Sequence, residues 1–106
     1  MSGLKVKAKV SELQSGEKKA VRVGLSRVLL VNVDGNFYAV GSRCPHLHLV
    51  LSDGPLEGNV ITCPHHGSQF DVITGKVLKG PASKPLPTYK VRIEGEDVLI
   101  DGKNST

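Results

Sequence analysis

The sequence predicts a small all-β domain, and three observations lead to this fold class. Aromatic residues are few, so the core has to rest mainly on Val, Leu and Ile, and such β-branched enrichment favours strands. Short apolar or alternating segments are separated by turn-forming residues. No stretch has a convincing helical period longer than a turn or two. With 106 residues, the chain has the length of one domain with a modest core.

Four strands are predicted in the first part of the chain. The first alternates lysines with apolar residues, as on the outer face of an edge strand that resists aggregation. The Asp34-Gly35 pair is a strong two-residue hairpin signal, and it delivers the chain directly to Cys44. The four predicted strands are Leu4 to Val10, Ala20 to Val23, Leu25 to Val33 and Asn36 to Val40.

The second part of the chain predicts five further strands. Residues 52–59 are dense in turn formers, and Thr74-Gly75 predicts a small hairpin. Prolines indicate an extended segment before residue 88, and the tail from Gly102 to Thr106 is expected to fray. The predicted strands are Val60 to Thr62, Phe70 to Ile73, Lys76 to Leu78, Thr88 to Glu94 and Val98 to Ile100.

The soft and borderline metal-ligating residues gather in two short segments. Residues 44–48 read Cys-Pro-His-Leu-His and residues 63–67 read Cys-Pro-His-His-Gly, which accounts for both cysteines and all four histidines. Core residues are not distributed in this way. Two thiolates and two imidazoles fit either a tetrahedral zinc ion or a binuclear iron–sulfur cluster with one iron on the thiolates and the other on the imidazoles. The ligand types alone leave both open.

The residues around these ligands resemble the Rieske [2Fe-2S] family. Its two boxes are Cys-x-His-x-Gly and Cys-x-x-His-Gly, and the second commonly continues into an aromatic residue, an Asp and a Thr-Gly turn. Here residues 63–75 read Cys-Pro-His-His-Gly-Ser-Gln-Phe-Asp-Val-Ile-Thr-Gly. Residues 80–82, Gly-Pro-Ala, are similar to the proline-containing loop that covers the cluster in that family. The resemblance spans about Val33 to Ile100.

The resemblance implies the Rieske fold over a single domain, residues 1–106. Antiparallel strands would form a barrel-like base from about residues 1–43 and 83–106. Residues from about 44 to 82 would form a smaller cluster-binding lobe.

For the ligands, the resemblance implies a [2Fe-2S] cluster with Cys44 and Cys63 on one iron and His46 and His66 on the other. The residue types alone leave His65 as a rival, because it also neighbours Cys63. The family places the ligand immediately before the glycine, which selects His66.

Several positions depart from the Rieske proteins of cytochrome bc complexes. His48 stands where the first box usually has glycine, and it is expected to be a solvated loop residue. Leu49 and His65 stand where those proteins have two further cysteines, so that disulfide cannot form. Ser68 matches a serine that hydrogen-bonds a cluster sulfide, whereas Phe70 replaces a tyrosine whose hydroxyl reaches a cysteine sulfur. With one donor missing, we expect a reduction potential in the lower half of the Rieske range of about −150 to +300 mV.

The resemblance and the site together predict a soluble one-electron carrier that passes electrons from a reductase to an oxygenase or other terminal acceptor. The chain offers no Ser/His/Asp arrangement, no phosphate-binding glycine loop and no remaining carboxylate cluster, so we expect an electron-transfer protein rather than an enzyme. The larger Rieske oxygenases need a further domain with mononuclear iron, and in 106 residues we expect no such domain. The alternatives are a permanently bound redox or sensing subunit and a structural zinc-binding interaction module.

The net charge is +4, but the basic residues are dispersed. They form no stripe interleaved with aromatics, so we expect no nucleic-acid partner. They indicate either a solvated face or an electrostatic preference for an acidic redox partner. Both cysteines serve as ligands, the N-terminus lacks a signal-peptide pattern, and no segment has the length of a membrane span. We therefore expect a cytoplasmic monomer that does not bind membranes.

Overall fold

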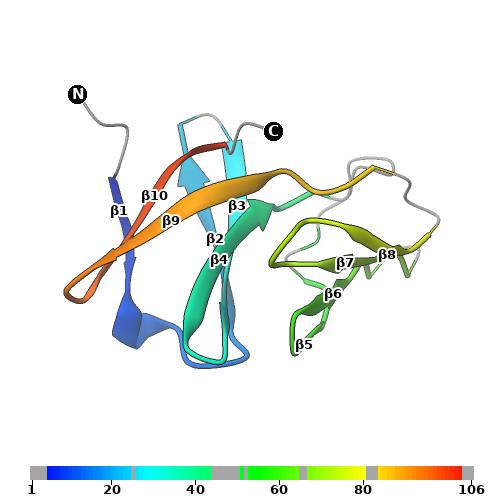
Figure 1. Ribbon diagram of the computed structural model, residues 1–106, viewed down its shortest axis with the longest axis horizontal. Helices are drawn as coiled ribbons and strands as arrows, with labels where there is room; N and C mark the ends of the chain where they lie inside the picture. The colour runs from blue at the N-terminus through cyan, green and yellow to red at the C-terminus, as the bar shows by residue number, and fades with distance from the viewer. Residues whose placement is uncertain are drawn as a thin grey trace.

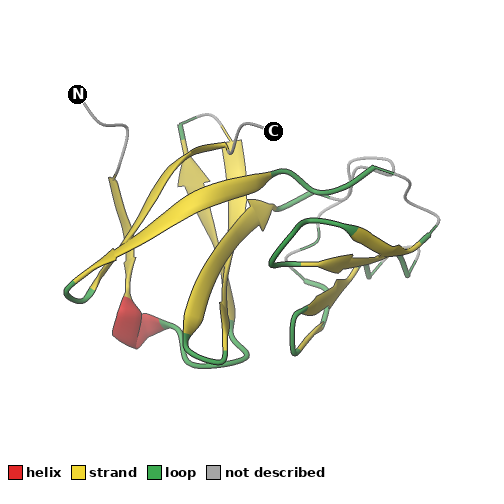
Figure 2. Cartoon of the chain, viewed as in Figure 1, coloured by secondary structure: helices red, strands yellow, loops and turns green. Residues whose placement is uncertain are grey.

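The structure, a computed structural model, describes residues 5–24, 26–43, 51, 53–64, 67–80 and 84–103. The strands of these residues form two antiparallel sheets, one of six strands and one of four (Figures 1 and 2). The predicted all-β class is confirmed. The strands are β1 (Lys5–Lys9), β2 (Lys18–Val23), β3 (Ser26–Val33), β4 (Asn36–Gly41), β5 (Leu56–Glu57), β6 (Val60–Thr62), β7 (Gln69–Asp71), β8 (Val77–Lys79), β9 (Thr88–Glu94) and β10 (Asp97–Lys103).

The six-stranded sheet, called the base here, has the strand order β1-β10-β9-β4-β3-β2. It curls upon itself until β10 contacts β2, so it is nearly a closed barrel. Its interior is filled by small and medium aliphatic side chains, as expected for a sequence with few aromatics. The buried residues of this base core are Ala8, Leu13, Val28, Leu30, Ala39, Val98 and Ile100.

The β3–β4 hairpin brings the chain to the first predicted ligand segment. Its turn has positive φ angles at both Asp34 (53°) and Gly35 (89°), the combination that a two-residue turn between twisted strands requires. The side chain of Asn32 fixes this corner, since its Oδ1 accepts from the N–H of Gly35 at 2.8 Å and its Nδ2 donates to the carbonyl of Leu13 at 2.8 Å. The hairpin prediction is confirmed.

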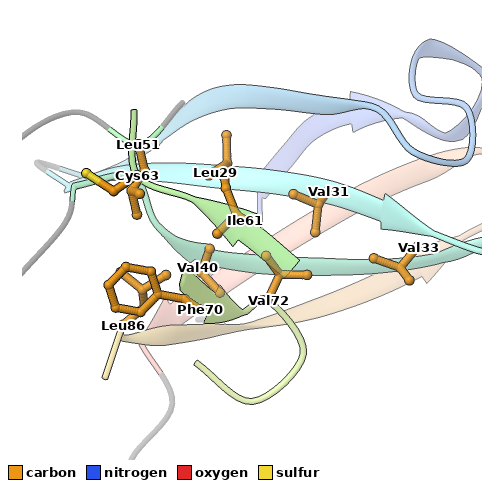
Figure 3. Close-up of a cluster of buried hydrophobic side chains, with 10 residues drawn as sticks. All are labelled: Leu29, Val31, Val33, Val40, Leu51, Ile61, Cys63, Phe70, Val72 and Leu86. Atoms are coloured by element: carbon orange, nitrogen blue, oxygen red, sulfur yellow. The ribbon is translucent and has the colours of Figure 1, made fainter. Parts of the chain in front are cut away.

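The four-stranded sheet, β5-β6-β7-β8, lies beside the base (Figure 1). Its strands are only two or three residues long. It rests on the base through a second buried cluster, the shared core, which Figure 3 shows in close-up. Its members are Leu29, Val31, Val33, Val40, Leu51, Ile61, Cys63, Phe70, Val72 and Leu86.

The position of β3 between the two cores explains why the middle of this strand is continuously apolar. Residues alternate between the two faces of a strand. Val28 and Leu30 belong to the base core, whereas Leu29 and Val31 belong to the shared core, so both faces of β3 are buried.

Some expectations about strand ends are wrong. The first strand stops at Lys9, and residues Val10–Glu12 form a 3-10 turn. A bulge between Val6 and Ala8 breaks the alternation, which leaves Val6 51% exposed. The last strand runs through Gly102 to Lys103, so the predicted fraying is wrong for these two residues.

In the four-stranded sheet, β5 was expected to be part of a turn region. Residues Leu56–Glu57 pair with β6 although turn formers surround them. The strand predicted over Phe70 to Ile73 ends at Asp71, because the N–H of Ile73 turns back to the Asp71 carboxylate at 2.8 Å.

Candidate metal centre

Of the four predicted ligands, Cys63 lies among the described residues. Cys44, His46 and His66 lie outside them, as do His48 and His65. The ligand set as a whole therefore stays a prediction.

Cys63 directly follows β6, at the start of the segment that leads to β7. The Cys63 N–H donates to the carbonyl of Ser68 at 2.7 Å, and the N–H of Gly67 donates to the carbonyl of Cys63 at 3.0 Å. Gly67 has a φ of +77°, a conformation that favours glycine. These bonds extend the pairing of Thr62 with Gln69, so the ends of the loop are fixed by the sheet.

The side chain of Cys63 is 1% exposed and forms no disulfide. Figure 3 shows it at one end of the shared core, with its sulfur directed away from Ile61 and Val31. A thiolate is costly to bury without a positive partner, and a metal ion supplies one. The position therefore fits a cluster ligand that the protein shields from water.

Ser68 and Phe70 share a sheet face with Cys63. Phe70 pairs with Ile61, so Phe70 is the diagonal cross-strand neighbour of Cys63, within reach of an aromatic side chain. Both Ser68 and Phe70 have no exposed surface. Within the described residues no buried side-chain nitrogen or oxygen lacks a partner. The serine places a hydroxyl in this buried environment, whereas the phenylalanine offers no donor.

Gly54 is a positioning residue that the sequence pattern did not single out. A Cβ atom at this position would lie 1.9 Å from the carbonyl oxygen of Thr62 and 3.1 Å from Cδ of Pro64. Only glycine permits the backbone at Gly54 to approach the Cys63 segment so closely. In the sequence Gly54 is one of several glycines in a turn region, and a contact between distant segments has no local signal.

The segment before β9 joins the two sheets. The N–H of Leu86 donates to the carbonyl of Gly75 at 2.8 Å, and the N–H of Gly41 donates to the carbonyl of Pro87 at 2.9 Å. This segment follows the predicted third loop, of which Pro81 and Ala82 lie outside the described residues. These two bonds tie the segment to the turn between β7 and β8 and to the end of β4.

Comparison with known families identifies the fold and the cofactor. The sequence model of the Rieske [2Fe-2S] domain matches residues 4–90. The chain belongs to the Rieske [2Fe-2S] domain family. The predicted resemblance and the predicted [2Fe-2S] cofactor are confirmed.

Relatives of this Rieske chain are components of oxygenase systems. This chain is 43% identical over 93 residues to the biphenyl dioxygenase ferredoxin subunit of Pseudomonas sp. (strain KKS102). The aligned residues cover 87% of this chain and 85% of the relative. It is 44% identical over 94 residues to the 3-phenylpropionate/cinnamic acid dioxygenase ferredoxin subunit of Escherichia coli (strain K12), which covers 87% of each. Because both are named as ferredoxin subunits, the prediction of an electron carrier rather than a catalytic enzyme is confirmed.

Solved structures agree with the fold. A chain in the complex of reduced oxygenase and oxidized ferredoxin of carbazole 1,9a-dioxygenase superimposes with a TM-score of 0.92 at 32% identity, covering 100% of this chain and 99% of that one. The Sphingomonas yanoikuyae B1 ferredoxin gives 0.86 at 34% identity, with 92% and 97% covered. In the described parts of the present chain, no helix has the length and hydropathy needed to span a bilayer.

Proposed function

We propose that this protein carries single electrons from a reductase to an oxygenase. Its cluster would be held by Cys44 and Cys63 on one iron and by His46 and His66 on the other. When bound, such a cluster takes up and releases one electron. The observation that carries the proposal is the buried thiol of Cys63 in a loop closed by its own backbone hydrogen bonds.

The residues of the chain contribute rigidity and shielding to this function. The Cys63 loop is tied to β7, and the Gly54 backbone packs against it, so the ligand can keep its position when the charge of the site changes. The shared core excludes water from one side of Cys63. A fixed, dry environment reduces the reorganisation that accompanies electron transfer.

We further propose that residues 44–82 form the cluster-binding lobe on a base made of residues 1–43 and 83–106. The sheet β5–β8 falls within the first range, which supports this division. An oxygenase is the proposed acceptor because relatives are named as ferredoxin subunits of dioxygenases. We place the protein in the cytoplasm as a monomer, since an electron carrier whose cysteines both serve as ligands suits a reducing compartment.

The ligand set can be tested with two neighbouring histidines. His66→Ala should abolish cluster incorporation, measured as iron and acid-labile sulfide per chain. His65→Ala is the matched control and should retain both. Loss of the cluster in His65→Ala with retention in His66→Ala would reverse the ligand assignment.

The carrier role can be tested by rapid mixing. The reduced protein, purified alone, should transfer its electron to the oxygenase of a biphenyl dioxygenase system, which is followed by the return of the oxidised visible spectrum. A permanently bound subunit would instead copurify with a partner and be unstable without it. Failure to transfer an electron, with an intact cluster, would contradict the proposal.

A further inference from the structure

Two arginines face each other across the β2–β3 hairpin. Arg22 and Arg27 are directly paired in the antiparallel register, and both are exposed. Like charges in directly opposed positions destabilise a sheet. The ion pairs found among the described residues join neither guanidinium to a carboxylate. Among the side chains that the structure describes, no carboxylate lies within ion-pairing distance of either guanidinium, so both can accept an anion from outside the chain.

The space beside these arginines suits a small acidic group. An open hollow of about 240 Å³ is lined by Ala20, Val21, Arg22 and Arg27. Ala20 is two residues from Arg22 on the same face of β2, and its short side chain leaves the hollow open. A guanidinium donates two parallel N–H groups to a carboxylate, so a pair of arginines can bind carboxylates in a fixed orientation.

The arginine pair lies at the end of the base that meets Cys63. Leu29 is two residues from Arg27 on the same face of β3, roughly 7 Å along the strand. Leu29 packs in the shared core with Cys63 and Leu51, and Figure 3 shows all three at the same end of it. Backbone bonds continue this link, since the N–H of Ser42 donates to the carbonyl of Arg27 at 3.2 Å and the N–H of Leu51 donates to the carbonyl of Ser42 at 2.8 Å.

We propose that Arg22 and Arg27 form a docking site for surface carboxylates of a protein redox partner. This inference rests on the proposed electron-carrier function. The net charge of +4 attracts an acidic surface over a distance, and the arginine pair fixes its orientation on contact. Ser42, which is bonded to the Arg27 carbonyl, lies two residues before Cys44 in the chain. The partner would thus be held beside the site from which the electron leaves.

Small redox ions test the site without a known partner. Hexacyanoferrate(III) takes one electron from the reduced protein and becomes hexacyanoferrate(II), whereas tris(phenanthroline)cobalt(III) is a cationic one-electron oxidant. The double variant R22Q/R27Q should react with hexacyanoferrate(III) roughly 3- to 10-fold more slowly than the wild type at low ionic strength, below or at the low end of the roughly 10- to 10³-fold effects of electrostatic steering, because the site is open and holds only two charges. Added salt should remove the difference. The rate with the cationic oxidant should not fall.

The control variant K9Q/R92Q removes the same charge from β1 and β9. Arg92 pairs with Leu99, whose other neighbour is Val6 of β1, and β1 lies on the side of the base away from the four-stranded sheet (Figure 1). Lys9 and Arg92 are exposed and form only surface ion pairs, with Asp97 and Glu94. Their removal should change the rate with hexacyanoferrate(III) much less. Equal slowing in both double variants would show an effect of net charge alone and overturn the proposal.

Poly-L-glutamate serves as the probe for a carboxylate-bearing polypeptide. It should slow the reaction of the wild type with hexacyanoferrate(III) and have little effect on R22Q/R27Q. If it slows neither, the arginines bind small ions only and the docking proposal is wrong. The single variant R22Q on edge strand β2 should show the same trend and, because it removes a repulsion, should melt no lower than the wild type. A wild type that reacts with neither oxidant would refute the carrier function itself.

Discussion

The base and the four-stranded sheet are stabilised in different ways. The base has a core of its own, between strands of five to eight residues. The four-stranded sheet has strands of two or three residues, and its buried side chains belong to the core that it shares with the outer face of β3 and β4. Isolated short hairpins are marginal in water. The sheet that carries Cys63 therefore depends on the base for its stability, whereas the base core contains no residue of that sheet.

Replacing two neighbouring leucines one at a time should show that the two sheets differ in thermal stability. Leu29→Ala removes a side chain from the shared core, and Leu30→Ala removes one from the base core. Each should lower the free energy of unfolding by about 2–5 kcal/mol, since both side chains are fully buried. In Leu29→Ala the visible absorbance of the cluster should be lost on heating before the far-ultraviolet signal of the base. In Leu30→Ala the two signals should be lost together, and identical melting of both variants would contradict the difference between the regions.

The Gly54 contact with the end of β6 should be sensitive to substitution. Gly54→Ala places a methyl group against the Thr62 carbonyl and should cost about 1–3 kcal/mol or more, with reduced cluster content. Gly58→Ala is the control, because its Cβ would meet nothing within 4 Å and only its φ of +59° opposes the substitution. Its cost should be about 1 kcal/mol, with the cluster retained. Iron content and thermal unfolding distinguish the two, and equal cluster loss would argue against the contact.

A substitution at Phe70 should change the reduction potential of the cluster rather than the stability of the protein. Phe70→Tyr adds a hydroxyl to the diagonal neighbour of Cys63, and a new hydrogen bond to its sulfur would favour the reduced state. A net hydrogen bond of about 1 kcal/mol corresponds to a rise of roughly 40 mV for one electron. Protein-film voltammetry measures this. Tyr89→Phe removes a hydroxyl from a residue packed on the base core and should leave the potential unchanged.

A surface ion pair of the base should give the smallest effect. The Lys19 ammonium hydrogen-bonds the Glu12 carboxylate at 2.9 Å and holds the pKa of Glu12 below its ordinary value of 4.5. Because the folded pKa is lowered, this stabilisation is present above pH 4.5 and is lost as the pH falls through the folded pKa. Glu12→Gln should lower the melting temperature slightly at about pH 7, and this difference should shrink as the pH falls below 4.5 and through the folded pKa of Glu12. Cluster absorbance at room temperature should be the same in both proteins, because the base stays folded without this exposed ion pair. A loss of cluster absorbance would contradict a purely surface role of the pair.

Local signals in the sequence predicted most strands, and long-range contacts explain the failures. Val60–Thr62 and Thr88–Glu94 were predicted with their observed ends, because turn residues flank both. Strand β5 was missed, since two residues carry no period and their pairing with β6 is a tertiary contact. The bulge at Val6 likewise has no signature in an alternating segment.

The candidate site was predicted from residue types and their spacing. Cys63 lies where that prediction needs it, buried at the end of a strand, while the other three ligands lie outside the described residues. Gly54 could not have been predicted, because its role arises only when two distant segments meet. The Arg22–Arg27 pair depends in the same way on the register of β2 against β3.

The most direct test of the central claim is the electron paramagnetic resonance of the reduced protein, with nitrogen couplings resolved by pulsed methods. If two irons are bound by sulfur on one side and imidazole on the other, the spectrum should show one unpaired spin per chain with couplings to two histidine nitrogens. Chemical analysis of the same sample should find two irons and two acid-labile sulfides, as a [2Fe-2S] cluster requires. A signal without nitrogen coupling, or a protein that contains zinc and no sulfide, would contradict it.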